Sequence, residues 1–286
     1  MKIMIMTDLE GPSGINGRAD TVGNKTVNLP IACQVLTDEV NATVQGLIAG
    51  GADEVVVWDG HGGSNSIDIT KLKAPAMLGT IGGPMHPACF CDASYDAVVQ
   101  IGCHALQGTP DGYMCHSFNS HGVCNMWLND ELIGEIGMEA RLASYFKLPT
   151  ILIGGDVAAC REAKALLPDV TTVATKKGLS RYTVIDRNPA DVQAELRKAA
   201  EKAAKNFKKY KVLPTSKSYV FRLELMCENS ACGYEMRGWE RLAHNMVQTK
   251  SDNIIDIFAQ YCGWAPGVHN KKYGITPKWR GLEFHK

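Results

Sequence analysis

The sequence has no excess of charge of either sign, and this argues against several classes of protein. Its 286 residues contain 30 Lys and Arg and 30 Asp and Glu, so the formal net charge at pH 7 is zero. A protein without a net charge has no general attraction for polyanions. We therefore expect no nucleic-acid partner and no binding to an anionic membrane surface.

The sequence also lacks a long apolar run. No stretch approaches the roughly 18 uninterrupted apolar residues of a membrane helix. The apolar residues KIMIM near the start are followed by Asp8 and Glu10, which interrupt the run well short of a signal-peptide core, and no small-residue cleavage site follows. We expect a structural strand at this position and a cytoplasmic protein.

The ten cysteines form no CxxC pair and no regular framework. Without export, reduced thiols are expected. Cys89 with Cys91, and Cys227 with Cys232, could bind a metal, but each pair lacks a second pair at the spacing of a zinc finger. We favour the interpretation that the cysteines are small buried apolar residues.

Apolar runs alternate with helical patterns over the first two-thirds of the chain, which is typical of βα units around a parallel sheet. Asn129 or Asp130 is the candidate N-cap of the helix predicted over 131–146. We therefore predict an α/β fold with a mostly parallel, doubly wound sheet flanked by helices. Strands are predicted within 2–8, 53–63, 95–105 and 150–156, and helices over 31–51, 131–146, 157–167 and 189–210.

The composition changes near residues 212–218, VLPTSKS, where turn residues gather. Beyond them, YVFRLELM alternates with the period of a strand, and DNIIDIFAQYCGW predicts a helix. We predict a catalytic α/β domain over residues 1–212 and a smaller C-terminal α/β subdomain over residues 213–286. We interpret the lysines at the end of the helix predicted over 189–210 as a solvated face rather than a nucleic-acid site.

Side chains that can bind a metal follow three of the predicted strands. Asp8 and Glu10 follow the first strand in TDLEG, His61 the second in DGHGG, and His104 the third in GCHA. Residues two apart in a strand point to one face, and ligands collect at the carboxyl ends of parallel strands. Two bare carboxylates would repel each other, whereas a divalent ion with added imidazoles makes a mixed ligand set that suits zinc.

Each of these residues also has a simpler explanation when taken alone. Asp8 could cap the turn, His61 could be an exposed loop residue, and His104 could be a hydrogen-bonded core histidine. Three unrelated coincidences would then be needed at three strand ends. The joint placement therefore favours the metal site.

Together with MCHS at 114–117 and NDELIGEIG at 129–137, these motifs resemble those of the zinc-dependent D-aminopeptidases of the DppA type. They occur in the order of that family and near its spacings, and the similarity extends into the C-terminal region. The resemblance implies two zinc ions per subunit, with Asp8 bridging them. The ligands that it implies are Asp8, Glu10, His61, His104 and Glu135. Without the resemblance, Glu135 would be explained by its favourable place near a helix N-terminus.

His116 matches the catalytic histidine of this family, whereas His121 in the same loop does not fall on the motif position and is interpreted as peripheral. Cys115 stands where family members often have a small hydroxyl residue. A Cys–His nucleophile is disfavoured because adjacent residues rarely direct their side chains at each other. One extra residue between His104 and His116 leaves the substrate preference open.

The resemblance implies hydrolysis of short peptides with an N-terminal D-residue, such as D-alanine, by metal-activated water. It also implies a homo-oligomer, a decamer of two stacked five-membered rings. His116 could act as nucleophile, as general acid or base, or as oxyanion stabiliser. Two alternatives stay open: a related metal-dependent amidase or peptidase acting on L-peptides or peptidoglycan-derived peptides, and a non-catalytic metal-dependent binding module.

Overall fold

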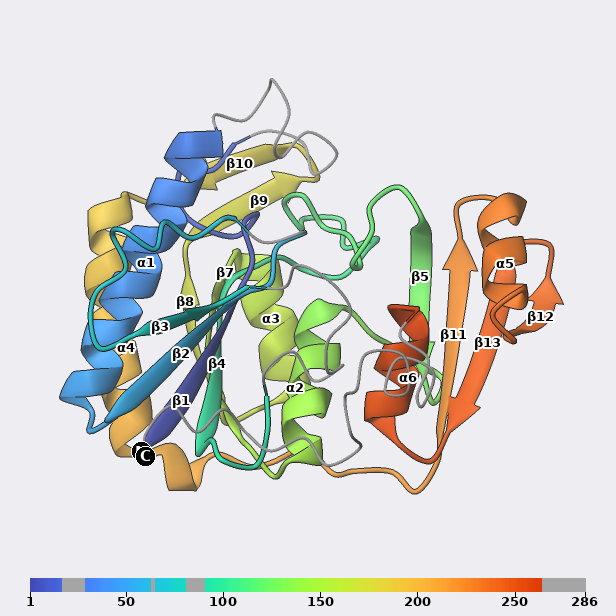
Figure 1. The fold of residues 1–286 in the computed structure, drawn as a ribbon. Helices are drawn as coiled ribbons and strands as arrows, with labels where there is room; N and C mark the ends of the chain where they lie inside the picture. Colours follow the sequence, from blue (N-terminus) through green and yellow to red (C-terminus); the bar gives the residue numbers. More distant parts are fainter. Residues whose placement is uncertain (17–28, 63–64, 81–90, 264–286) are drawn as a thin grey trace.

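A six-stranded sheet forms the centre of the molecule (Figure 1). The computed structural model describes residues 1–16, 29–62, 65–80 and 91–263. All neighbouring strands of this sheet are parallel, and their order is β3-β2-β1-β4-β7-β8. The strands are β1 (Lys2–Thr7), β2 (Glu54–Asp59), β3 (Met77–Gly79), β4 (Ala97–Cys103), β7 (Thr150–Gly155) and β8 (Thr171–Ala174).

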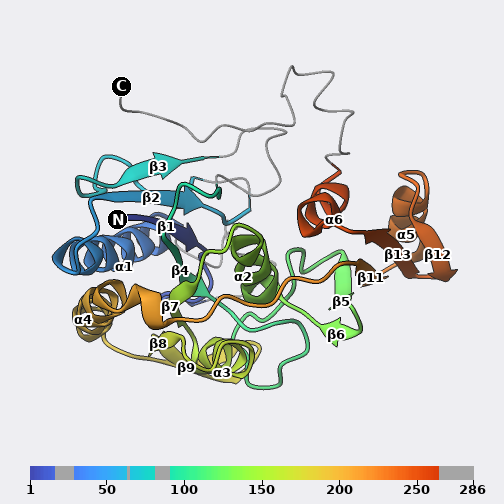
Figure 2. The same cartoon turned by 90° about the horizontal axis from the view of Figure 1, so that it is seen from below.

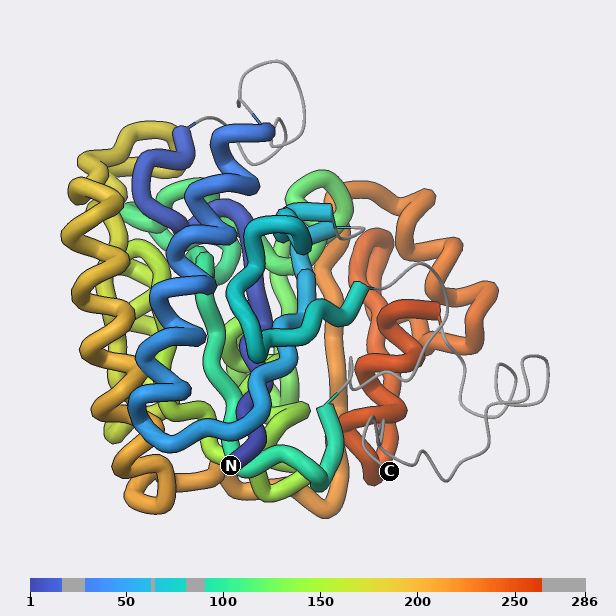
Figure 3. The backbone as a smooth tube through the Cα atoms, turned by 60° about the vertical axis from the view of Figure 1, so that its left-hand side comes forward, coloured from blue at the N-terminus to red at the C-terminus, as the bar shows by residue number. Residues whose placement is uncertain are grey.

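The sheet is covered by helices on both faces, as Figure 2 shows. Helices α1 (Leu29–Ala49) and α4 (Pro189–Lys205) pack side by side on one face, which is seen in Figure 3. Helices α2 (Glu135–Tyr145) and α3 (Val157–Leu166) cover the other face. The predicted α/β fold with a parallel sheet is confirmed.

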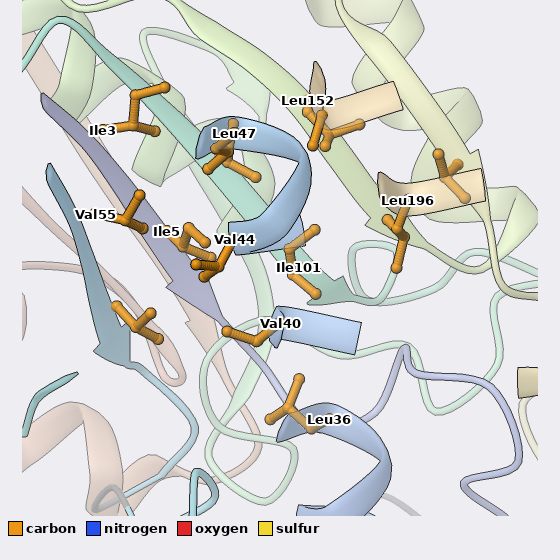
Figure 4. Close-up of a cluster of buried hydrophobic side chains, with 14 of the residues drawn as sticks. Ile3, Ile5, Leu36, Val40, Val44, Leu47, Val55, Ile101, Leu152 and Leu196 are labelled. Atoms are coloured by element: carbon orange, nitrogen blue, oxygen red, sulfur yellow. The ribbon is translucent and has the colours of Figure 1, made fainter. Parts of the chain in front are cut away.

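Strand β1 is buried on both of its faces, as expected for the centre of a parallel sheet. Ile3 and Ile5 point into the core shared with α1 and α4, part of which is drawn in Figure 4. Met4 and Met6 point into a second core on the opposite face. This double burial explains why the first strand is a continuous apolar run.

A second sheet is antiparallel, with the order β12-β13-β11-β5-β6. Its longest strand, β11, alternates buried and half-buried residues as the sequence predicted. The second core joins this sheet to helices α2 and α6. The elements are β5 (Val123–Leu128), β6 (Glu131–Leu132), β11 (Tyr219–Leu225), α5 (Glu228–Glu235), β12 (Glu240–Ala243), β13 (Met246–Ser251) and α6 (Ile254–Tyr261). Strands β5 and β6 belong to this sheet although they precede residue 213. The division of the chain at residue 212 stays a prediction.

The predicted start of the helix at Glu131 is wrong, and so is its cap at Asn129 or Asp130. Asn129 and Asp130 have φ values of 50° and 69° and form the two-residue loop between β5 and β6. Positive φ at both central residues is what a tight hairpin turn requires. Helix α2 starts at Glu135, with Gly134 at the N-cap.

The other predicted elements differ mainly in length. Helix α4 ends at Lys205 and is followed by a 3₁₀ turn over Phe207–Lys209, so the predicted helix to Tyr210 is too long. The hairpin of β9 (Lys176–Ser180) and β10 (Thr183–Asp186) was not predicted. Among the described residues, no helix is both long and apolar enough to cross a membrane.

Gly102 permits the close approach of two strand ends, and its replacement by Ala is a test of that approach. At Gly102 φ is 85°, and a Cβ would lie 1.9 Å from the carbonyl oxygen of Asp8. Gly108 is a matched control, with φ of 83° but no atom within 4 Å of the added Cβ. We expect Gly108→Ala to cost about 1–2 kcal/mol in conformational strain, and Gly102→Ala roughly 1–3 kcal/mol more from overpacking. Denaturant unfolding of both variants measures the difference, and equal losses would contradict the close approach.

Candidate metal centre

The carboxyl ends of β1, β2 and β4 lie side by side, because Thr7 pairs with Asp59 on one side and with Ile101 on the other. Beyond β1 the chain stays beside β4, since the amide of Asp8 donates to the carbonyl of Ile101 at 2.9 Å. The residues that follow the three strands therefore meet at one edge of the sheet. This is the edge at which the sequence predicted a metal site.

His61 reaches both carboxylates that follow β1. Its Nδ1 lies 2.9 Å from Oδ1 of Asp8 and 3.2 Å from Oε2 of Glu10. The two carboxylates are thus directed at one point, as their spacing in the sequence predicted. His61 thus joins Oδ1 of Asp8 to Oε2 of Glu10.

The second oxygen of Asp8 faces a different pair of side chains. Nε2 of His104 lies 3.1 Å from Oδ2 of Asp8 and 3.2 Å from Oε1 of Glu135. Glu135 comes from the first turn of α2, and its Oε1 accepts a hydrogen bond of 2.6 Å from the amide of Phe118. Asp8 is therefore shared by two groups of donors, one on each of its oxygens.

Two histidines present Nε2 to this cluster because their other ring nitrogen is engaged. Nδ1 of His104 lies 2.9 Å from the carbonyl oxygen of Ala105, and Nδ1 of His116 lies 2.9 Å from that of Met114. A carbonyl oxygen only accepts, so Nδ1 carries a proton, and in the neutral form of the ring the lone pair is on Nε2. The backbone thus orients both rings for binding or proton transfer.

His116 lies over the cluster, against the ring of His104. The two ring centroids are 4.0 Å apart with an interplanar angle of 15°. Nε2 of His116 is 3.7 Å from Oε1 of Glu135 and 4.0 Å from Oε1 of Glu10. His116 therefore faces both donor groups.

The donor atoms fit a zinc centre in chemistry and in spacing. Oε2 of Glu10 and Nε2 of His104 are buried and make no hydrogen bond within the described part of the chain. In each group the histidine nitrogen lies 2.9–3.2 Å from two carboxylate oxygens, close to the roughly 3.3 Å between neighbouring ligands of a tetrahedral zinc. Carboxylates with imidazoles are a common zinc ligand set. The residues present therefore fit a zinc ion, and they include groups of three donor atoms within 4.8 Å of one another.

The side chains of the cluster shift one another's pKa. Burial opposes ionisation of Asp8, yet the nearby His104 and His61 hold its pKa well below the usual value. Burial likewise opposes ionisation of Glu135, but the nearby His104 lowers its pKa. The pKa of His104 is raised well above its usual value, because Glu135 and Asp8 outweigh the effect of burial. The contacts among these side chains thus favour the ionised forms of Asp8 and Glu135 and the protonated form of His104.

The two other candidate side chains of this loop, His121 and Cys115, make their contacts outside the cluster. His121 is exposed, and its Nδ1 contacts the hydroxyl of Ser120 at 3.3 Å. Cys115 is buried, and its thiol contacts the carbonyl oxygen of Thr109 at 3.4 Å. The described cysteines are free thiols, and Cys89 lies outside the described residues.

Two further acidic residues near the cluster were not predicted. Burial, together with Glu135 and Asp8, raises the pKa of Glu139 well above its usual value. Its position four residues after Glu135 on the same helix could have indicated it. Asp156 follows β7 and accepts a hydrogen bond of 2.8 Å from the amide of Tyr113, in the loop that carries His116. Its position directly after the fourth predicted strand could have indicated Asp156.

Comparisons with known proteins found relatives of this chain. The model of the Peptidase M55 family, described as D-aminopeptidase, matches residues 1–261. A D-aminopeptidase of Bacillus subtilis (strain 168) is 32% identical over 227 residues, which cover 78% of this chain and 81% of that protein. A solved structure of the Zn-dependent D-aminopeptidase DppA from Bacillus subtilis, described as a self-compartmentalizing protease, has a TM-score of 0.85 and 28% identity. The match covers 92% of this chain and 96% of that one.

Metal binding to this cluster is expected to release protons. The carboxylates of Glu10 and Asp8 outweigh burial and raise the pKa of His61 to about 11, so its ring is protonated at neutral pH. A metal ion binds only the neutral ring, so the apparent affinity should rise with pH below 11, about tenfold per unit for one proton. Calorimetric zinc titrations in buffers of different ionisation enthalpy measure the release, with His121→Ala as the control. Affinity independent of pH would contradict this arrangement.

Proposed function

The chain belongs to the Peptidase M55 family of D-aminopeptidases, and from this we propose that it is a zinc-dependent enzyme that removes an N-terminal D-residue from short peptides. The observation that carries the proposal is the placement of Asp8 between two donor groups, with Nε2 of His116 facing both. The activity follows from the family, and the zinc from the donor chemistry and from the relative described as Zn-dependent.

We propose that each subunit holds two zinc ions. Asp8, Glu10 and His61 would hold one ion, and Asp8, His104 and Glu135 the other. The division is supported by the two oxygens of Asp8, each of which faces a different histidine. In this assignment Asp8 is the bridging ligand.

When bound, zinc ions that share a carboxylate supply an acidified water and polarise the scissile carbonyl. His116 then serves as the proton-transferring residue of the chain. Its Nδ1–H is held by the carbonyl of Met114, which leaves Nε2 to accept a proton and pass it to the leaving amine, or to donate to the developing oxyanion. The stacked ring of His104 fixes the plane of His116.

Two of the three carboxylates of the cluster are accessible from solvent. Glu10 is 1% exposed, whereas Asp8 and Glu135 are partly open to solvent. A substrate would therefore approach the proposed zinc ions from the side of Asp8 and Glu135, and the requirement for a free N-terminus rests on the family. The preference for the D configuration rests on the family.

We further propose that the chain forms a homo-oligomer, a decamer of two stacked rings with the active sites facing an internal channel. The support is the sequence resemblance together with the relative described as a self-compartmentalizing protease. A cytoplasmic location stays a prediction.

Replacing His116 separates proton transfer from metal binding. We expect His116→Ala to lower kcat about 100- to 10,000-fold, the contribution of a positioned acid or base, and to leave the zinc content unchanged. His121→Ala, in the same loop but exposed, is the control and should match the wild type. Steady-state kinetics and metal analysis measure both quantities. Full activity of His116→Ala, or loss of its zinc, would contradict the assigned role.

Metal removal and substrate configuration test the activity itself. We expect a chelator to abolish hydrolysis of D-alanyl dipeptides and tripeptides and added zinc to restore it, because the carboxylates and imidazoles alone supply no acidified water. Peptides with N-terminal L-alanine are the matched controls and should be cleaved more slowly. Hydrolysis that survives metal removal would contradict a zinc enzyme, and faster cleavage of L-peptides or peptidoglycan-derived peptides would indicate a related peptidase.

A further inference from the structure

Lys176 is a buried cation beside the candidate metal centre. It is the first residue of β9, and its side chain is 0% exposed. Its ammonium donates hydrogen bonds to the carbonyl oxygens of Glu10, at 2.9 Å, and of Ile15, at 2.8 Å. Burying an ammonium group is costly unless it is paired, and here the carboxylate of Asp186 at 3.9 Å joins the two carbonyl oxygens, so these contacts are a strong constraint on the chain.

The two acceptors of Lys176 stand at the ends of the turn that follows β1. Other groups hold the residues between them: Glu39 accepts from the amide of Ser13 at 2.8 Å, and Asp186 accepts from the amide of Gly14 at 2.8 Å. Lys176 differs from these supports because it holds the peptide group of Glu10 itself. It thereby fixes the backbone from which a candidate zinc ligand extends.

Lys176 also contacts the loop that carries His116. Its Nζ lies 4.9 Å from the ring centroid of Tyr113, which is 2% exposed. Tyr113 is three residues before His116, and its amide is held by Asp156. One side chain therefore touches both the turn of Glu10 and the loop of the catalytic candidate.

We propose that Lys176 is a positioning residue, whose ammonium holds the main chain of Glu10 so that its carboxylate stays beside His61 and Asp8. The inference rests on the proposed function, because it concerns the zinc ion held by Glu10. Lys176 acts on only one of the two donor groups, since its hydrogen bonds reach Glu10 and neither His104 nor Glu135.

Zinc titration of Lys176→Met tests this role. The variant keeps the length and apolar stem of the side chain but removes both donors. We expect it to weaken one of the two zinc-binding steps about tenfold or more, the same step that Glu10→Gln weakens, and to leave the step weakened by Glu135→Gln within about threefold. Lys177→Met removes the exposed neighbouring lysine and should bind both ions like the wild type.

Rescue distinguishes positioning from a general loss of stability. Lys176→Arg keeps donors for the two carbonyl groups and should recover most of the lost affinity. Equal weakening of both steps, or wild-type binding by Lys176→Met, would overturn the inference. If Lys176→Met is insoluble, the same titration on Lys176→Gln decides, with selective loss of the Glu10 step supporting the role and unchanged binding contradicting it.

The wild type, measured alongside, separates this inference from the proposed function. A wild type that binds no zinc and cleaves no D-peptide would refute the proposed function and the role of Lys176 with it. A wild type with two zinc ions and D-peptidase activity, beside a Lys176→Met variant of equal affinity at both steps, would refute the role of Lys176 alone.

Discussion

The carboxylate of Asp8 lies between two histidines, and the candidate site depends on this one arrangement. Its oxygens are 2.9 Å from Nδ1 of His61 and 3.1 Å from Nε2 of His104. The two rings follow different strands and approach from opposite neighbours of β1. Because the central strand of a parallel sheet has a neighbour on each side, a residue at its end can be shared in a way that a residue at an edge strand cannot.

The surrounding structure holds Asp8 and Glu10 through their main-chain groups. Gly102 lets β4 approach the carbonyl of Asp8 closely, and Lys176 donates a hydrogen bond to the carbonyl of Glu10. Carboxylates repel one another, so other contacts must hold them close together. Here the supporting contacts are to main-chain groups, and they keep the carboxylates in place before any ligand binds. Such preorganisation is what a metal or catalytic site requires.

The sequence predicted the parts of the fold and site that have a regular signal. Asp8, His61 and His104 stand directly after apolar runs, so their meeting follows from parallel strands alone. Glu135 came only from the family resemblance, since a carboxylate near a helix start has an ordinary explanation. Lys176 lies in the polar stretch TKKGLSRY, where nothing distinguishes a buried lysine from an exposed one, because its burial depends on the turn after β1. The sequence predicts a helix cap at Asn129 or Asp130, where the structure has a hairpin, because Asn and Asp favour both positions.

The central claim is that Asp8 divides the donors between two metal ions. The most direct measurement is an anomalous difference map, recorded at the zinc absorption edge from crystals of the zinc-loaded protein. The account predicts two peaks per chain, one beside Glu10 and His61 and the other beside His104 and Glu135, with the carboxylate of Asp8 between them. A single peak, or peaks that do not contact Asp8, would contradict it.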